Sequence, residues 1–100
     1  MKSRSEKNQL LDNLCAALLS LKNADEATSF LKDLCTPQEL QVLAERWNVC
    51  CLLATGDYSY RDIHAQTGVS LATIGRVARF LNDEPHGGYQ SVLNRMNKKK

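Results

Sequence analysis

Apolar residues recur at helical spacing along most of this chain, and capping residues stand just before several of these stretches. The first apolar stripe covers residues 9–21 and is wider than a single neighbouring helix would cover. Asn23 and Glu26 have the spacing of an N-cap and capping box for a second helix. Residues 1–8 are polar, so we expect a frayed segment before these two helices.

The third predicted helix is the longest and is apolar on two sides. Thr36 is its N-cap, Pro37 takes the first helical position, Glu39 takes the third, and Gly56 ends it. One stripe consists of Leu40, Leu43, Ala44, Trp47, Cys50, Cys51 and Ala54, and the other of Val42, Val49, Leu52 and Leu53. Because the helices that follow are short, we expect a partner subunit to cover the second side.

Residues 59–81 have the pattern of a helix-turn-helix. Ser59 and Asp62 form a capping box for a short helix, and Gly68 ends it where the backbone needs a positive φ. Ser70 caps a second helix, whose inward positions are Ile74, Val77, Ala78 and Leu81. Two short helices joined by such a turn are typical of proteins that place the second helix in the DNA major groove.

A breaker stretch with Pro85, Gly87 and Gly88 separates this motif from a last helix over residues 89–96. The chain shows no β-alternation, internal repeat or low-complexity segment. We therefore expect an all-α single domain over residues 1–100. Residues 9–56 and 89–97 would form its dimerisation core, and residues 59–81 its DNA-binding unit.

The net charge of +2 is weak for a nucleic-acid-binding protein, but the charge is unevenly distributed. Residues 1–58 carry a net charge of −2, whereas residues 59–82 carry +2 from three arginines against one aspartate. The remaining +2 comes chiefly from Lys98, Lys99 and Lys100, which we interpret as a solvated tail. The positive charge on the helix-turn-helix favours phosphate contacts there.

The sequence does not indicate an enzyme, a metal centre or a membrane protein. The two histidines lie far apart, and the cysteines form no C-x-x-C pair and have no histidine at zinc-ligand spacing. We interpret Cys15, Cys35, Cys50 and Cys51 as small buried apolar residues, with a redox sensor as the alternative. No apolar run approaches about 18 residues, and we expect a cytoplasmic protein without a cofactor.

With these elements placed, the chain resembles the Trp repressor superfamily, and most closely its YerC/YecD branch. The resemblance rests on these motifs: T-P-x-E at 36–39, Arg46, Gly56, R-D-I at 61–63, Gly68, L-A-T-I-x-R at 71–76 and Pro85. It implies six helices per chain and two chains intertwined as a homodimer, which agrees with the two-sided third helix. It also implies a transcription regulator that acts as a repressor and binds a near-palindromic site in double-stranded DNA.

The resemblance, together with the outward face of the helix that Ser70 caps, predicts the residues that bind DNA. They are Arg61, His64, Ser70, Leu71, Ala72, Thr73, Gly75 and Arg79. By position, Arg61 matches a base-contacting arginine and Thr73 a phosphate contact, and the two residues after Ser70 approach base edges. Gly75 departs from the threonine of the family. His64 stands where the tryptophan-binding repressors have lysine, and we interpret it as a surface residue.

The resemblance also marks an effector pocket: Thr36, Arg46, Arg76, Val77 and Phe80. Thr36 and the two arginines match tryptophan-binding positions. However, Val77 stands where the tryptophan repressors have glycine, and Phe80 where they have serine. Because Phe80 would fill the space of the indole ring, we expect a regulator that does not use tryptophan. The two arginines would then pair with a carboxylate such as Glu39 or Glu45.

Two other hypotheses remain open. The protein could be a DNA-binding sensor whose altered pocket accepts an unidentified small molecule. It could instead be a helical module whose helix-turn-helix contacts another protein. DNA binding that strengthens steeply as salt falls would separate both DNA-binding hypotheses from the third.

Overall fold

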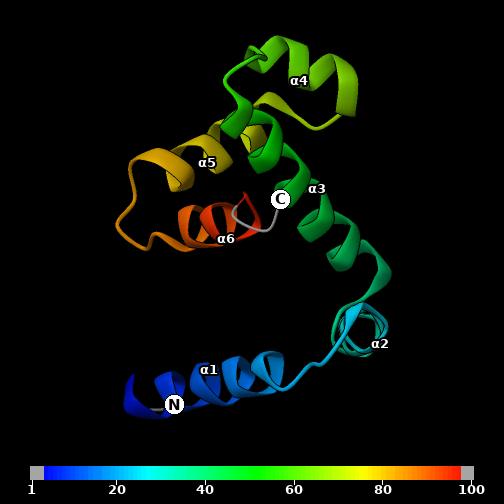
Figure 1. The fold of residues 1–100 in the computed structure, drawn as a ribbon, viewed down its shortest axis with the longest axis vertical. Coiled ribbons are helices and arrows are strands. Elements are labelled where there is room, and N and C mark those ends of the chain that lie inside the picture. The colour runs from blue at the N-terminus through cyan, green and yellow to red at the C-terminus, as the bar shows by residue number, and fades with distance from the viewer. Residues whose placement is uncertain (1–3, 98–100) are drawn as a thin grey trace. The chain divides into compact units, whose positions relative to one another are not determined.

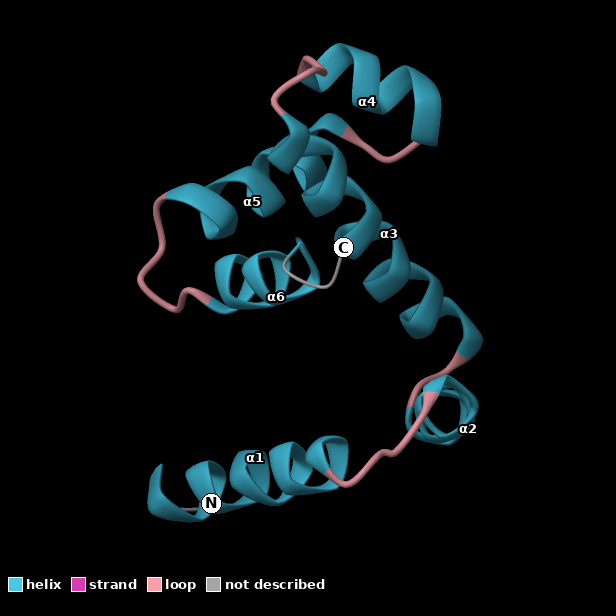
Figure 2. Ribbon diagram, viewed as in Figure 1, coloured by secondary structure: helices cyan, strands magenta, loops and turns pink. Residues whose placement is uncertain are grey.

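The computed structural model describes residues 4–97 and places them in six α-helices joined by short connections (Figures 1 and 2). The helices are α1 (Arg4–Leu19), α2 (Ala24–Leu34), α3 (Pro37–Thr55), α4 (Tyr60–Thr67), α5 (Leu71–Asn82) and α6 (Gly88–Asn97). No strand occurs within residues 4–97, so the predicted all-α class with six helices is confirmed. The three C-terminal lysines lie outside the described residues.

The predicted starts of α2 and α3 are confirmed by side-chain hydrogen bonds. The Thr36 hydroxyl accepts from the Glu39 amide at 3.0 Å, and the Glu39 carboxylate accepts from the Thr36 amide at 2.8 Å. The Asn23 side chain accepts from the Glu26 amide at 2.9 Å. The Glu26 carboxylate, however, accepts from the Lys22 amide rather than from that of Asn23. The cap of α2 is therefore as predicted, and its reciprocal bond is displaced by one residue.

Helix α1 begins at Arg4, so the prediction of a frayed segment is wrong for residues 4–8. These residues are polar, and apolar periodicity detects only the face of a helix that packs. Arginine, glutamate and lysine nevertheless have high intrinsic helix propensities. Propensity therefore extends the helix beyond the apolar stripe from which it was predicted.

The chain divides into two units, Met1–Leu40 and Gln41–Lys100. The first contains α1 and α2, and none of its described side chains is buried. Its large exposed apolar residues are Leu10, Leu11, Leu18, Leu19 and Leu34. Apolar side chains concentrated in this way are typical of a surface that packs against another element.

The second unit contains the hydrophobic core, which joins α3, α4 and α5. Its buried residues are Val49 and Cys50 of α3, Ile63 of α4, Val69 of the following turn, and Ile74, Val77 and Leu81 of α5. Side chains of α3 and α6 pack against this cluster: Trp47, Leu52, Leu53, Tyr89 and Leu93. The predicted inward face of α5 is thereby confirmed. Helix α3 is covered on the side that faces this core, whereas its Val42 and Leu43 are exposed.

The cysteines differ in their surroundings. Burial, with a smaller effect of the neighbouring Cys51, raises the pKa of the Cys50 thiol to about 11. Cys50 therefore stays protonated at neutral pH and behaves as a small apolar residue. Cys15 is exposed, so its interpretation as a buried residue is wrong.

Replacement of Gly68 should destabilise the fold, whereas replacement of Gly75 should stabilise it. Gly68 has φ of +75°, and nothing lies within 4 Å of the position that a Cβ would take. Gly68→Ala should thus lower the free energy of unfolding through backbone strain alone, by roughly 1–2 kcal/mol. Gly75 lies within α5 in equally open surroundings, so Gly75→Ala should raise this free energy by up to about 1 kcal/mol. Urea denaturation checks both, and shifts of the same sign would contradict this view.

Candidate nucleic-acid interface and adjoining cavity

Both helices of the helix-turn-helix begin at predicted caps. At the start of α4, the Asp62 amide donates to the Ser59 hydroxyl at 3.1 Å, and the Ser59 amide donates to the Asp62 carboxylate at 2.9 Å. At the start of α5, the Ser70 hydroxyl accepts from the Thr73 amide at 3.1 Å. These bonds satisfy amide groups that a helix start leaves without partners, and so define where each helix begins.

The turn between α4 and α5 is held by local hydrogen bonds. The Gly68 amide donates to the His64 carbonyl at 2.9 Å. The Thr67 hydroxyl donates to the Ile63 carbonyl at 2.6 Å and accepts from the Val69 amide at 3.1 Å. The His64 ring nitrogen Nδ1 lies 2.7 Å from the Val69 carbonyl oxygen. Since Ile63 and Val69 are also buried in the core, the angle between the two helices is fixed by packing and by hydrogen bonds.

The structure leaves the predicted DNA-binding residues accessible. Those that are exposed are Arg61, His64, Ser70, Leu71, Ala72 and Arg79, and those that are half-buried are Thr73 and Gly75. Leu71 is 49% exposed at the first position of α5. An exposed leucine followed by alanine, with a glycine one turn on, gives this end of the helix an uncharged surface that can approach another molecule closely.

The Arg79 side chain lies near a carboxylate of the same chain. Its Nε lies 3.7 Å from the Glu84 carboxylate, and its guanidinium lies 5.1 Å from the ring centroid of Phe80. The Arg79 side chain is 59% exposed. Such an exposed ion pair is weak, so it leaves Arg79 able to bind an external anion.

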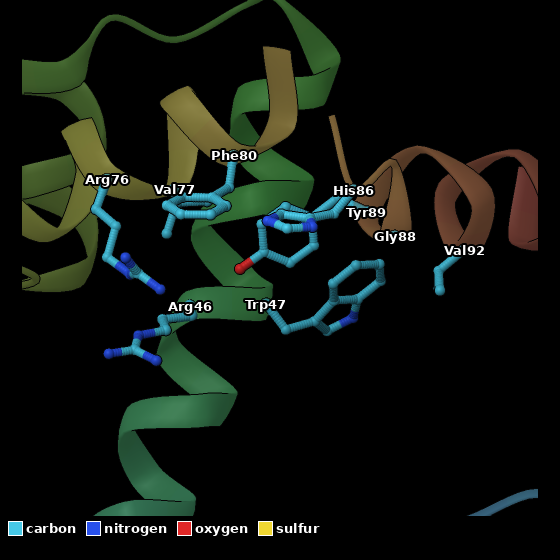
Figure 3. Close-up of a pocket in the computed structure, with 9 residues that line it drawn as sticks. All are labelled: Arg46, Trp47, Arg76, Val77, Phe80, His86, Gly88, Tyr89 and Val92. Atoms are coloured by element: carbon cyan, nitrogen blue, oxygen red, sulfur yellow. The ribbon is translucent and has the colours of Figure 1, made fainter. Parts of the chain in front are cut away.

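A cavity of about 460 Å³ lies between α3, α5 and α6 (Figure 3). Its lining residues are Arg46, Trp47, Arg76, Val77, Phe80, His86, Gly88, Tyr89 and Val92. The guanidinium groups of Arg46 and Arg76 lie on one side of it, and Trp47 and Val92 lie on the other. The Tyr89 hydroxyl is directed toward the arginine side. The cavity therefore combines a cationic wall with an aromatic one.

The Phe80 ring forms part of the cavity wall and is held from several directions. The Arg76 guanidinium lies 4.4 Å from its centroid, in a cation–π contact. The His86 ring stacks on it with centroids 5.9 Å apart and an interplanar angle of 5°. Val77, the other predicted bulky position, is 1% exposed and belongs to the core as well as to the lining.

The predicted pairing of the cavity arginines with a carboxylate is not observed. Within residues 4–97, neither Arg46 nor Arg76 forms an ion pair. The Glu39 carboxylate accepts from the Thr36 amide, and the Glu45 carboxylate accepts from a glutamine one turn earlier. The buried Nε of Arg46 has no hydrogen-bond partner. Thr36, also assigned to the pocket, caps α3 and is not among the lining residues.

Five of the nine lining residues were not identified from the sequence, and these are Trp47, His86, Gly88, Tyr89 and Val92. The one available signal was the position of Trp47 directly after Arg46, which puts an aromatic ring beside a cation on α3. The contribution of α6 depends on how α6 packs, which apolar spacing does not reveal.

The remaining features to consider are a second cavity, metal-ligating clusters and membrane-spanning helices. A smaller cavity of about 280 Å³ is lined mainly by polar side chains of α3 and of the α4–α5 turn: Gln41, Ala44, Glu45, Asn48, Gln66, Thr67 and Val69. No cluster of three or more metal-ligating side chains occurs in the described part of the chain. Over the same residues, no helix has the length and hydrophobicity to span a membrane.

Comparison with known proteins places this arrangement in a family. A family model described as Trp repressor protein matches residues 9–97. YerC of Bacillus subtilis (strain 168), an uncharacterised protein, is 43% identical over 86 residues, which cover 86% of this chain and 81% of YerC.

Two solved structures are similar along almost their whole length. The crystal structure of a TrpR-like protein from Eubacterium eligens has a TM-score of 0.84 at 40% identity, covering 95% of this chain and 96% of that one. A Trp-repressor-type structure from Staphylococcus aureus has a TM-score of 0.79 at 37% identity and covers 96% of each chain. The fold of this family is a regulatory DNA-binding fold and not that of an enzyme. The chain therefore belongs to the Trp repressor family, and within that superfamily to the YerC-like proteins.

Proposed function

We propose that this protein is a sequence-specific DNA-binding transcription regulator, acting in the cytoplasm as a homodimeric repressor without tryptophan as corepressor. The observation that carries the proposal is the accessible N-terminal end of α5, set on a turn that packing and hydrogen bonds hold rigid. The chain acts as one domain, in which residues 59–81 bind DNA and residues 9–56 and 89–97 form the dimer core.

In this proposal α5 enters the major groove with its first turn foremost. Ala72 and Gly75 leave room for the base edges, and Arg61 at the start of α4 donates hydrogen bonds to a base. Thr73 and Arg79 contact the phosphate backbone, which positions the helix without reading sequence. Two such helices related by a two-fold axis would bind a near-palindrome.

Exposed apolar side chains support the homodimer. The first unit buries none of its described residues, and its leucines are exposed. In the second unit, exposed apolar residues occur on α3 and α6: Val42, Leu43, Val92 and Met96. A second copy of the chain would remove these groups from water, at a gain of about 25 cal/mol per Å² of apolar surface.

The contacts of Phe80 support independence from tryptophan. An indole placed against the two cavity arginines would compete for volume with the Phe80 ring, which Arg76 and His86 hold in place. Repacking such a site costs about 1–3 kcal/mol. Phe80 thus places an aromatic ring of α5 itself in the cavity wall.

One observation favours the alternative of a ligand-responsive sensor. The buried Nε of Arg46 has no partner, and a cavity of about 460 Å³ adjoins it. Small-molecule sites commonly have such volumes and apolar walls with a few polar groups. The ligand would be a flat anion other than tryptophan. Thermal unfolding scans with aromatic carboxylates, for the unmodified protein and for Arg46→Gln, would detect it.

The protein should be a dimer at low micromolar concentration. Sedimentation equilibrium should give a mass near twice the 11.2 kDa of one chain. Leu11→Glu places a charge at an exposed leucine of α1 and should weaken the dimer, whereas Gln9→Glu adds the same charge on the same helix and should not. A folded monomer of the unmodified chain would rule out the dimer.

Arg61 and Arg79 should differ in what they contribute to DNA binding. Arg61→Ala should lose about 1–3 kcal/mol of discrimination at one base pair, because a base contact specifies sequence. Arg79→Ala should weaken cognate and random DNA alike and reduce the salt slope by about 1, because a phosphate contact is independent of sequence.

Fluorescence anisotropy with both duplexes over a range of salt measures these effects. Arg95→Ala removes the same charge from α6 and serves as the control. Equal losses by Arg61→Ala on cognate and random DNA would contradict its assignment. If the unmodified protein showed no salt-dependent binding, a protein partner would become the better hypothesis.

L-Tryptophan should neither bind this protein nor change its affinity for DNA. Calorimetric titration at millimolar tryptophan should show no saturable heat, because the Phe80 ring already occupies the face of the Arg76 guanidinium on which an indole would stack. Phe80→Ser should enlarge the cavity without touching the buried Val77, and weak tryptophan binding should then appear. Phe80→Leu keeps most of the side-chain volume and serves as the control. Saturable binding by the unmodified protein would defeat the steric argument.

A further inference from the structure

His64 has a fixed orientation at the turn of the helix-turn-helix. Its Nδ1 lies 2.7 Å from the Val69 carbonyl oxygen, and a carbonyl oxygen can only accept a hydrogen bond. Nδ1 therefore carries a hydrogen, and in the neutral ring Nε2 carries none. The residue is exposed, and its Nε2 has no hydrogen-bond partner among residues 4–97. The ring thus offers one free nitrogen, which is an acceptor when neutral and a donor when protonated.

The ring lies beside the end of α5 that is proposed to meet DNA. Val69, which anchors it, directly precedes Ser70, the N-cap of α5. A recognition helix enters the major groove by this end, between the phosphates that border the groove. The unpaired amide groups at the start of a helix add positive potential there. A phosphate oxygen near His64 would therefore face both a helix N-terminus and the free ring nitrogen.

No carboxylate on the described helices around the turn neutralises the His64 ring. The charged residues on the three helices that meet at the turn are Glu39, Glu45 and Arg46 of α3, Arg61 and Asp62 of α4, and Arg76 and Arg79 of α5. None of them forms an ion pair with His64. The three carboxylates are engaged locally, Glu39 by the Thr36 amide, Asp62 by the Ser59 amide and Glu45 by a glutamine. A charged His64 would consequently find its counter-charge outside the chain.

We propose that His64 is a proton-dependent phosphate contact. With Nδ1–H held by Val69, uptake of a proton from solvent at Nε2 creates a charged donor that binds an oxygen of a phosphodiester in double-stranded DNA. The inference rests on the proposed DNA-binding function and adds a regulatory property to it. Histidine changes charge between about pH 5 and pH 8, so DNA binding tightens as pH falls through that range. Each protomer takes up a proton when it binds DNA.

The test measures the affinity of the full chain for a duplex from about pH 8 to pH 6. The unmodified protein should bind roughly threefold to tenfold more tightly at the lower pH, and its salt slope should steepen by about 0.9 for each phosphate gained. His64→Asn keeps an N–H at the delta position for Val69 but has no titratable nitrogen, so its affinity should not respond to pH in this way. His64→Lys should bind tightly throughout. His86→Asn removes the other histidine and should keep the pH response of the unmodified protein, whatever the loss of its contact with Phe80 does to the affinity at a single pH.

A second measurement needs no variant. Calorimetry of the unmodified protein with DNA in two buffers of different ionisation enthalpy should show net proton uptake near neutral pH. The same pH response in His64→Asn, or no proton uptake by the unmodified protein, would overturn the assignment of His64. In either case, salt-dependent binding at the higher pH would leave the proposed function intact. Absence of DNA binding at every pH would overturn both.

Discussion

The structure depends on the burial of one side of α5 against α3 and α4. Ile74, Val77 and Leu81 of α5 pack with Ile63 of α4 and with Val49 and Cys50 of α3. Helices of 8 and 12 residues, the lengths of α4 and α5, are marginal in isolation because the first turn of a helix is costly to form. Tertiary burial must therefore stabilise them. Because this core also fixes their mutual angle, it determines which side chains of α4 and α5 remain available to a partner.

This arrangement gives α5 two roles. Its inward and lateral residues, among them Val77 and Phe80, belong to the core or line the cavity. Its first turn, with Leu71 and Ala72, is exposed. Any change of packing beside Phe80 would act on the same rigid helix that carries the proposed DNA contacts. In this chain the Phe80 ring packs against the Arg76 guanidinium and the His86 ring, which belong to the same chain.

Much of the fold could be predicted from the sequence because the signals are local. A capping residue such as Thr36 or Ser59 acts on amides three residues away, and a glycine such as Gly68 is required by its own backbone angle. The start of α1 was predicted too late because its first turn is polar and depends on propensity.

The site was predicted less completely, because it depends on contacts between elements. The exposure of Arg61 and Leu71 follows from helical periodicity, and the structure agrees with it. The approach of Tyr89 to Trp47, with ring centroids 6.3 Å apart, depends on how α6 packs against α3. The bond from His64 to Val69 depends on the path of the turn. No spacing along the chain encodes either of these two contacts.

The central claim is that the exposed end of α5 reads DNA sequence as part of a two-fold symmetric dimer. Selection of bound duplexes from a random pool by the full chain tests it most directly. The account predicts enrichment of a near-palindrome whose half-sites are one helical turn apart, about 34 Å between centres. Enrichment of no sequence, or of an asymmetric site read by a single helix, would contradict it.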